Sequence, residues 1–513
     1  MDTPSFYVLD FGGQTARLIC RRLRDLKLHA DVLPGTVKAD RIPKSRLRGL
    51  VLSGGPSSVY EAGAPQVDPA IFSLGVPVLG ICYGLQTTTR ALGGEVVKGM
   101  SGEYGHARLK FPAPSRLLEG MNENHEVWMS HGDRLGSLPE GFMVSATTDH
   151  CPYAAVEDSA RGIYGVQFHP EVTHTREGLK VLRNFALGIC KAREDWTMAS
   201  YISQSTADIR ARVGSERVLC ALSGGVDSSV LAKLLLKAVG SQLTCVFVDH
   251  GLLRLREAEQ VREAFAKEMG SRLVVVDASE RYFAALMGVT DPERKRKIIG
   301  GLFIDVFQEE AKKLQGVRYL AQGTIHSDVI ESAGTGGKLA HSIKSHHNVG
   351  GLPEKLGFEL VEPLRELFKD EVRTLGRELG LSEALVDRHP FPGPGLAVRV
   401  PGEVTREACD ILRQADAIFI EELRNSGWYS KCFQAFAVLL PVRSTGVMGD
   451  GRTYERVCAL RCVGSEDVMT ADWTRLPHEI LARVSSRIIN EVRGINRVVY
   501  DISSKPPSTI EWE

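Results

Sequence analysis

The sequence has no apolar run long enough to cross a membrane. A membrane-spanning helix needs about 20 consecutive apolar residues, whereas the hydrophobic residues of this 513-residue chain, 43% of the total, are spread over shorter segments. The first residues, MDTPSFYVLDFGGQ, also lack the basic start and apolar core of a secretion signal. We therefore expect a cytoplasmic protein with no membrane partner.

The chain also lacks an excess of charge and the cysteine spacing of a metal or disulfide scaffold. Its 63 basic and 63 acidic residues give a formal net charge of zero, with no long basic run, so nucleic acid is not an expected partner. The 10 cysteines are scattered, often inside apolar segments as at Cys220 and Cys245, and none forms a CxxC pair. This pattern is typical of reduced thiols and does not support a structural zinc site.

The pattern of apolar segments predicts three domains, within the two to four expected for this length. Strand-like and helix-like segments alternate through residues 1–195 and again through 196–388, which predicts two α/β domains with doubly wound parallel sheets. Residues 389–513 begin with a proline–glycine segment and mix a long helix with strands, which predicts a small α+β domain. The Gly-, Ser- and His-rich stretch 328–356 has few apolar residues, and we expect a lid-like loop there.

The expected elements can be given by residue range. Strands are expected at 6–9, 29–33, 50–52, 76–79, 218–222, 243–248, 273–276, 319–321, 433–440, 455–462 and 498–502, and helices at 14–26, 179–190, 257–269, 298–314 and 405–425.

The most informative motif is SGGVDSS, residues 223–229, between an apolar segment and a helical pattern. A glycine-rich turn at a helix start directs backbone N–H groups toward an anion, and the serines add hydroxyl donors. The loop is not a Walker A loop, because no Gly-Lys-Ser/Thr follows at the required spacing. It resembles the pyrophosphate-binding loop of enzymes that split ATP between its α and β phosphates.

Other residues are candidates for the same site. Two of them end or follow strand-like segments, where ligands of parallel sheets bind, and Lys369 is a candidate phosphate clamp. Asp227 is a tentative ligand for Mg²⁺, the expected cofactor, because this ion prefers phosphate and carboxylate oxygens. The complete set predicted to bind ATP is Ser223, Gly224, Gly225, Val226, Asp227, Ser228, Ser229, Val248, Gly323 and Lys369.

A second motif, GICYGLQ at residues 80–86, predicts a nucleophile. Cys82 has glycine at both second neighbours, Gly80 and Gly84, as in a tight strand-to-helix turn. Such a turn places the sulfur at a helix N-terminus, which favours the thiolate. Downstream, GVQFHPE supplies His169 as a base and Glu171 to orient its ring. The two motifs predict a Cys82–His169–Glu171 catalytic triad.

These residues resemble a class I glutamine amidotransferase over about the first 195 residues of the chain. The resemblance implies an oxyanion hole made of backbone N–H groups, a glutamine-reading residue just past the elbow, and a loop, WMSHGD at 128–133, that clamps the amino-acid end of the substrate. The residues implied are Gly54, Gly55 and Tyr83 for the oxyanion hole, and Gln86, Ser130 and His131 for glutamine.

The whole chain resembles the glutamine-hydrolysing GMP synthetases. The specific strings are PERKRKIIG at 292–300, SHHNVGGLP at 345–353, HPFPGPGLAVRV at 389–400 and SKPPSTIEWE at 504–513. The resemblance implies a ligase that adenylates xanthosine 5′-monophosphate (XMP) with ATP and replaces AMP with ammonia from glutamine. It also implies a homodimer through residues 389–513, and an XMP site formed by Arg296, Gln434, Asp450, Lys505 and Glu511.

Three other interpretations compete with this one. An NAD synthetase also forms AMP from ATP and uses glutamine, but that family typically carries a different, nitrilase-like glutaminase. A tRNA-thiolating pyrophosphatase needs a sulfur-carrying cysteine and a basic surface, and neither is apparent. A non-catalytic nucleotide sensor fits poorly with an intact Cys82, His169 and Glu171 beside an intact phosphate loop.

Overall fold

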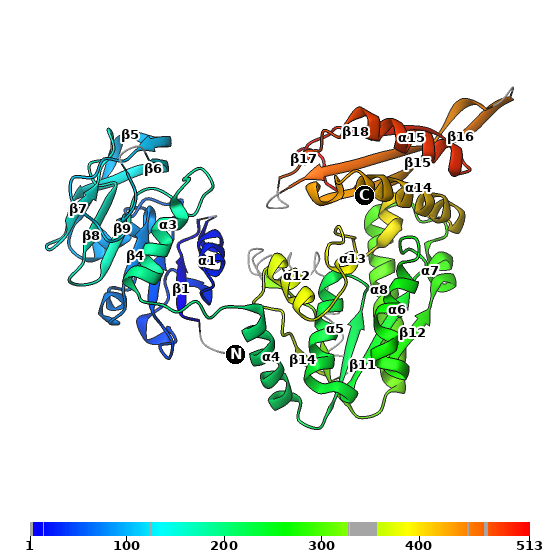
Figure 1. Ribbon diagram of the computed structural model, residues 1–513, viewed down its shortest axis with the longest axis horizontal. Coiled ribbons are helices and arrows are strands. Elements are labelled where there is room, and N and C mark those ends of the chain that lie inside the picture. The colour runs from blue at the N-terminus through cyan, green and yellow to red at the C-terminus, as the bar shows by residue number, and fades with distance from the viewer. Residues whose placement is uncertain are drawn as a thin grey trace. The chain divides into compact units, whose positions relative to one another are not determined.

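The structure is a computed structural model that describes residues 4–13, 15–122, 125–326, 328, 357–448, 451–465 and 470–513. The chain forms two compact units, Met1–Gln204 and Ser205–Glu513 (Figure 1). Asp450, the signature at 345–353 and almost all of the expected lid loop lie outside the described residues. The three predicted domain boundaries remain predictions.

The first unit is built on a seven-stranded sheet in the order β2-β1-β3-β4-β9-β8-β7 (Figure 1). Strands β2, β1, β3, β4 and β9 run parallel, and β8 and β7 are added antiparallel at one edge. Central strands such as β3 (GLVL) and β4 (VLGI) are buried along their whole length, which explains their continuous apolar sequences. The strands are β1 Phe6–Asp10, β2 Ala30–Pro34, β3 Gly49–Leu52, β4 Val78–Ile81, β7 Met143–Ala146, β8 Ala155–Asp158 and β9 Ile163–Val166.

Helices of this unit follow the predicted apolar stripes, and the α/β fold class is confirmed. The closing helix expected at 179–190 is α-helical only in its first part and ends as a π-helical turn. The helical elements are α1 Ala16–Asp25, α2 Tyr83–Ala91, α3 Gly178–Arg183, the π-helical turn Asn184–Ile189, and the short 3₁₀ turns Ala39–Arg41 and Pro69–Ser73.

The segment 128–133 is not a loop, so that prediction is wrong. It belongs to β6, Glu126–Ser137, which pairs antiparallel with β5, Glu95–Arg108. Its polar and glycine residues suggested a loop, yet the side chains alternate, with Val127, Met129 and His131 buried and Ser130 and Gly132 exposed. Period-two burial together with a pairing partner far along the chain makes this segment a strand.

The second unit contains a five-stranded parallel sheet in the order β12-β11-β10-β13-β14. Helix α8 begins at Pro292, earlier than the expected 298, because Asp291 caps it by accepting from the Arg294 N–H and proline suits the first turn. The strands are β10 Arg217–Leu222, β11 Leu243–Asp249, β12 Leu273–Asp277, β13 Val317–Ala321 and β14 Glu359–Val361. Helix α4, Met198–Val213, begins in the first unit and ends in the second. The other helices are α5 Val226–Val239, α6 Glu257–Met269, α7 Ser279–Leu286, α8 Pro292–Lys313, α12 Lys369–Glu378 and α13 Glu383–Val386, with 3₁₀ turns Gly240–Gln242 and Gly270–Arg272.

The C-terminal part of this unit is the predicted α+β arrangement. Long antiparallel strands β15 and β16 pair with each other, β17 pairs antiparallel with β16, and β18 pairs parallel with β16 (Figure 1). One apolar core is continuous between both parts of the unit and includes Phe307, Leu320, Leu396, Phe419 and Leu439. The elements are the 3₁₀ turn Gly395–Arg399, α14 Arg406–Asn425, the 3₁₀ turn Tyr429–Lys431, β15 Gln434–Met448, β16 Gly451–Gly464, β17 Asp472–Trp473, α15 His478–Glu491 and β18 Ile495–Asp501.

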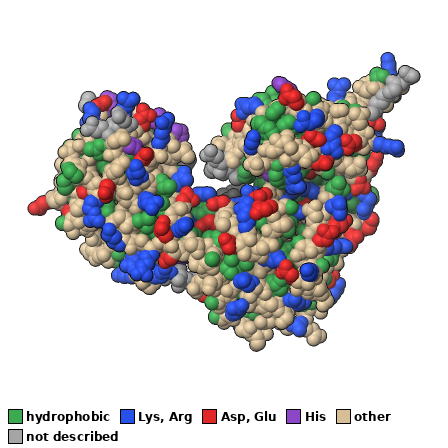
Figure 2. Space-filling view, in the orientation of Figure 1, with side chains coloured by type: hydrophobic (Ala, Val, Ile, Leu, Met, Phe, Trp, Pro, Cys, Tyr) green, Lys and Arg blue, Asp and Glu red, His purple; other side chains and the backbone are tan. Residues whose placement is uncertain are grey.

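Charged side chains of both signs are mixed over the face of each unit drawn in Figure 2, as the zero net charge suggests. Within the described residues, no helix combines the length and the apolar character that a bilayer crossing needs.

Candidate active sites

Cys82 lies at the turn between β4 and α2, as the sequence predicts. Its backbone has φ 51° and ψ −107°, an unfavourable conformation for a side chain with a Cβ. A Cβ at Gly80 would lie 2.7 Å from the Leu85 nitrogen, and one at Gly84 would lie 2.2 Å from the Leu52 carbonyl oxygen. The turn therefore tolerates only glycine two residues before and two residues after Cys82. It places Cys82 at the N-terminus of α2.

His169 and Glu171 follow β9 and face the same turn. The Nδ1 of His169 lies 2.8 Å from Oε1 of Glu171, and His169 is hydrogen-bonded to Cys82. Burial by itself lowers the pKa of His169, but the contacts with Cys82 and Glu171 outweigh it and raise this pKa to about 10. An imidazolium beside the sulfur stabilises negative charge there, so the structure brings the three predicted residues together with suitable electrostatics.

Strand β6 holds the backbone of His169 in place. The His169 N–H donates to the carbonyl of Trp128 (3.0 Å), and the hydroxyl of Thr175 donates to the carbonyl of His169 (2.7 Å). Thr175 also accepts from the Trp128 N–H (3.0 Å). These bonds link β6, β9 and the following turn, and they fix the direction from which the imidazole reaches Cys82.

Gln167 contacts the Cys82 sulfur and was not predicted. Its Nε2 donates to Sγ at 3.6 Å, the side chain is fully buried, and its Oε1 has no hydrogen-bond partner among the described residues. The sequence carried a weak signal, because Gln167 is a lone polar residue between apolar Val166 and Phe168.

Gly54 and Gly55, predicted oxyanion-hole residues, lie beside the triad. A Cβ at Gly54 would be 2.9 Å from Cε1 of His169 and 3.8 Å from the Cβ of Cys82, so only backbone fits at this position. A Cβ at Gly55 would be 3.2 Å from the ring of Tyr83. The structure therefore brings the predicted oxyanion-hole residues to the nucleophile.

The predicted glutamine-reading residues are tied to β6. Nε2 of Gln86 and Nδ1 of His131 both donate to the carbonyl of Asp133, at 2.9 and 3.0 Å. The other ring nitrogen of His131 lies 3.5 Å from Glu103, and burial lowers the pKa of His131 against the charge of this carboxylate. The carbonyl of Ser130 accepts from Sγ of Cys82 at 3.7 Å, so the strand borders the sulfur.

In the second unit, the phosphate loop joins β10 to α5. Oγ of Ser223 and Oγ of Ser228 lie 3.0 Å apart, and the Gly225 N–H donates to Ser223 Oγ at 3.3 Å. Gly224 has φ +80°, which a residue with a Cβ rarely adopts. Ser229 is fully buried, and its hydroxyl has no partner among the described residues. The loop thus has the predicted strand–turn–helix form.

Asp227 and Lys369 meet across the loop. Nζ of Lys369, the first residue of α12, lies 2.7 Å from both carboxylate oxygens of Asp227. Gly323 follows β13 and is so close that a Cβ there would be 3.5 Å from the Asp227 backbone, while Val248 lies near the end of β11. A half-exposed carboxylate next to the loop fits a divalent cation that takes its other ligands from ATP and water.

The residues implied for XMP are only partly brought together. Nε2 of Gln434 donates to Glu511 at 2.7 Å, whereas Arg296 donates to Glu293 and to the backbone of Glu513. Lys505 forms a backbone bridge with Ala471. Asp450 lies outside the described residues.

Arg399 is a residue of this region that the sequence did not single out. Its Nε and Nη2 donate to the two carboxylate oxygens of Glu511 at 3.1 and 2.9 Å. The side chain is fully buried, and Nη1 has no hydrogen-bond partner among the described residues. A buried nitrogen that still lacks an acceptor is a suitable donor for a ligand.

Family models and relatives match these clusters. The model for the class-I glutamine amidotransferase matches residues 7–189, that for the tRNA methyl transferase HUP domain matches 216–283, and that for the GMP synthase C terminal domain matches 421–512. Proteins named GMP synthase [glutamine-hydrolyzing] are 58% identical in Paraburkholderia phytofirmans and 57% in Thiobacillus denitrificans, over 99% of this chain and 99% of each relative. The relative from Heliobacterium modesticaldum is 56% identical over 99% of this chain and 98% of its own length.

The chain belongs to the glutamine-hydrolysing GMP synthase family. Among solved structures, a protein from Thermoplasma acidophilum that is described as part of a GMP synthase is 31% identical over 37% of this chain and 96% of its own, with a TM-score of 0.33.

The matches to the GMP synthase family cover the three groups of candidate site residues. The matched segments include Cys82, His169 and Glu171 in the first, the phosphate loop in the second, and Gln434 and Glu511 in the third. Lys369 and Arg399 lie between the second and third matched segments, and the relatives of full length cover them. The description of the HUP match does not name a GMP synthase, whereas the C-terminal match and the relatives of full length do.

Proposed function

We propose that this chain makes GMP from XMP, ATP and glutamine, releasing AMP, pyrophosphate and glutamate. The observation that carries the proposal is identity of 57–58% over 99% of the chain with GMP synthases that hydrolyse glutamine. The individual residue roles below are part of the proposal and rest on the geometry.

In the glutamine half-reaction, Cys82 attacks the side-chain amide carbon, and the oxyanion takes hydrogen bonds from backbone N–H groups at Gly54, Gly55 and Tyr83. His169, oriented by Glu171, passes its proton to the departing ammonia. Water then attacks the thioester, and His169 removes a proton from it. The cycle ends with glutamate and a free Cys82.

In the synthetase half-reaction, the loop 223–229 holds the β and γ phosphates while the O2 oxygen of XMP attacks the α phosphate of ATP. Lys369 leaves Asp227 for a phosphate oxygen, which offers the ammonium another negative charge. Ammonia displaces AMP from the adenylated purine, since AMP is a far better leaving group than hydroxide. We propose that Asp227 would hold a divalent cation, Mg²⁺, which would neutralise charge on the phosphates.

The XMP site is proposed to include Arg296, Gln434, Asp450, Lys505 and Glu511, with Arg399 added from the structure. The pair Arg399–Glu511 fixes a half-buried carboxylate beside Gln434, which suits recognition of purine edges or ribose hydroxyls.

We propose a homodimer formed through the C-terminal part, and a cytoplasmic location. Val442 and Val447 of β15 and Tyr454 of β16 are 60%, 76% and 58% exposed, which supports an intersubunit contact on these strands. Light scattering on the purified chain tests whether it is a dimer. The double variant Val447→Asp, Tyr454→Asp is expected to have a molar mass closer to that of a monomer.

Substrate choice is the deciding experiment. AMP formation is measured with ATP and ammonium in the presence of XMP, IMP, UMP or nicotinate adenine dinucleotide. We expect AMP with XMP and background with the others. AMP formation with the dinucleotide and not with XMP would refute the proposal in favour of an NAD synthetase, and none with any nucleotide would favour a sensor.

A further inference from the structure

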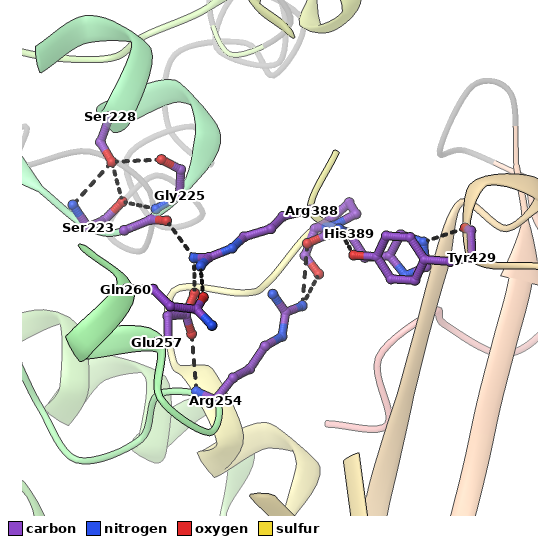
Figure 3. Close-up of polar contacts among 11 residues, drawn as sticks. Ser223, Gly225, Ser228, Arg254, Glu257, Gln260, Arg388, His389 and Tyr429 are labelled. Carbon is purple, nitrogen blue, oxygen red and sulfur yellow. Dashed lines mark hydrogen bonds and ion pairs between the residues drawn. The ribbon is translucent and has the colours of Figure 1, made fainter. Parts of the chain in front are cut away.

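Arg388 joins the phosphate loop to helix α6 (Figure 3). Its Nη1 donates to the carbonyl of Gly224 at 3.3 Å and to Oε1 of Glu257 at 3.0 Å, and its Nη2 donates to Gln260. The side chains of Arg388 and Glu257 are only 9% and 6% exposed. A guanidinium buried in this way has a fixed direction, because its planar fork matches three acceptors.

The contact with Gly224 sets the orientation of one peptide plane. In a trans peptide, the carbonyl and the following N–H point in opposite directions. Fixing the Gly224 carbonyl therefore turns the Gly225 N–H to the other side, where it meets Oγ of Ser223, itself beside Ser228. A carbonyl turned to that side would repel a phosphate, whereas an N–H attracts it.

This peptide needs an external anchor. Both of its flanking residues are glycine, so no Cβ opposes a flip of the plane. The side-chain hydrogen bonds described for Ser223 and Gly225 are local and depend on the hydroxyls of Ser223 and Ser228, which rotate easily. Arg388 reaches the loop from a different part of the chain, so it can hold the peptide when the hydroxyls rearrange around a ligand.

The segment that carries Arg388 is itself fixed. Nη2 of Arg254 donates to the carbonyls of His389 (3.3 Å) and Pro390 (3.1 Å). The N–H of Arg254 donates to Oε2 of Glu257, so the same carboxylate holds both arginines. Figure 3 shows these contacts in sequence from the phosphate loop to the proline–glycine segment.

The His389 ring also fixes the segment that carries Arg388. It stacks on Tyr429 with ring centres 3.8 Å apart and planes at 10°, its Nδ1 accepts from the Ala435 N–H, and its Nε2 donates to the Tyr429 carbonyl (Figure 3). Both ring nitrogens are used, so the ring cannot rotate without losing a bond. Arg388 is thus attached to the start of β15 on one side and to the phosphate loop on the other.

We propose that Arg388 is a positioning residue of the AMP-forming reaction, which holds the Gly224–Gly225 peptide with its N–H toward the pyrophosphate of ATP. The inference rests on the proposed function, since it assumes that this loop binds ATP. Arg388 touches no substrate in this role and acts through the loop and its carboxylate partner.

The test uses the full chain with Arg388→Gln and Arg388→Lys, and measures ammonia-dependent AMP formation, first with varied ATP at saturating XMP and then with varied XMP at saturating ATP. We expect kcat/KM for ATP to fall about 10- to 100-fold in Arg388→Gln, the range for a lost charge-assisted hydrogen bond, with the KM for XMP within about twofold of wild type. Arg388→Lys keeps the charge but not the fork, so it should recover only part of the loss. Arg377→Gln is the matched control, because Arg377 forms exposed ion pairs with Glu383 and Asp387, and it should behave as wild type.

Chemical rescue separates positioning from a general structural effect. Free guanidinium ion at millimolar concentration is expected to raise the activity of Arg388→Ala several-fold, and not that of wild type or Arg377→Gln. Normal kcat/KM for ATP in folded Arg388→Gln overturns the proposal. Equal losses for ATP and XMP without rescue by guanidinium or by Arg388→Lys overturn it as well. Absence of AMP from XMP in the wild type refutes the proposed function instead.

Discussion

Replacing Glu171 by Gln removes a charge from the amidotransferase site and keeps its shape. The carboxylate is fully buried and lies 2.8 Å from Nδ1 of His169. A glutamine of the same size can still accept through its side-chain oxygen, so the imidazole keeps its orientation. The experiment therefore isolates the electrostatic role of Glu171 from its packing.

The size of the effect follows from the pKa of His169. A rise from 6.5 to about 10 corresponds to roughly 5 kcal/mol in favour of the imidazolium. Cys82 and Glu171 share this stabilisation, so loss of the Glu171 charge should cost about 2 kcal/mol, or a ~30-fold drop in glutaminase kcat/KM. Because the folded pKa is raised, the imidazolium persists far above neutral pH in the wild type. In Glu171→Gln the imidazolium should lose its proton at a lower pH, and the alkaline limb of the pH profile of glutaminase activity should shift to lower pH.

Two assays check this. Glutamate release is measured against pH, and alkylation of Cys82 by iodoacetamide is followed over the same range. Ammonia-dependent synthesis should be unaffected, and Glu177→Gln, at a half-exposed carboxylate paired with Lys180, should match wild type. A variant with full glutaminase activity and an unmoved alkaline limb would refute the role assigned to Glu171.

Three further predictions concern other parts of the chain. Cys82→Ala should abolish glutamine-dependent synthesis and leave synthesis from ammonium salts, and loss of both rates in a folded protein would contradict two separate reaction centres. Asp227→Asn should lower pyrophosphate release by about 100-fold or more, as expected for a lost charge next to phosphate and metal, and a normal pyrophosphate yield would count against the loop assignment. Burial lowers the pKa of His250 and His389 to about 4, so the unfolded chain binds protons between pH 6.5 and 4 that the native chain does not. Above pH 6.5 both rings are neutral in the folded and the unfolded chain, so they do not reduce the free energy of unfolding. At pH 5 each ring should lower the free energy of unfolding by about 2 kcal/mol. Thermal unfolding at pH 7.5 and 5 measures this, and an unchanged midpoint would show that neither ring is held neutral.

Local patterns predicted much of the fold and the two main motifs. The apolar sequences of β3 and β4 can be recognised as strands without knowledge of distant residues. The glycines at positions 80 and 84 indicate a turn at Cys82 that leaves no room for a Cβ at either position. Strand β6 could not be predicted, because its pairing with β5 depends on residues far along the chain and its polar residues resemble a loop. Helix α8 begins earlier than its apolar pattern predicts, because charged residues hide its capped first turn.

The missed site residues share a physical reason. Gln167 and Arg399 are lone polar residues inside otherwise apolar segments, whereas Arg388 stands between Asp387 and His389, just before the proline–glycine segment. Each contacts partners that come from elsewhere in the chain. A buried arginine is unfavourable unless its acceptors converge on it, and the sequence does not show where those acceptors meet. Single polar residues within apolar strings therefore merit attention as site candidates.

The contact of Lys369 with Asp227 has a consequence for turnover. At the proposed ATP site, the ammonium of Lys369 already has an anionic neighbour on the protein. Moving it from a carboxylate to a phosphate exchanges one Coulomb attraction for another, so the ground-state grip on the nucleotide gains little. With the role proposed for Lys369, the same exchange in reverse gives the ammonium an anionic partner again when pyrophosphate departs.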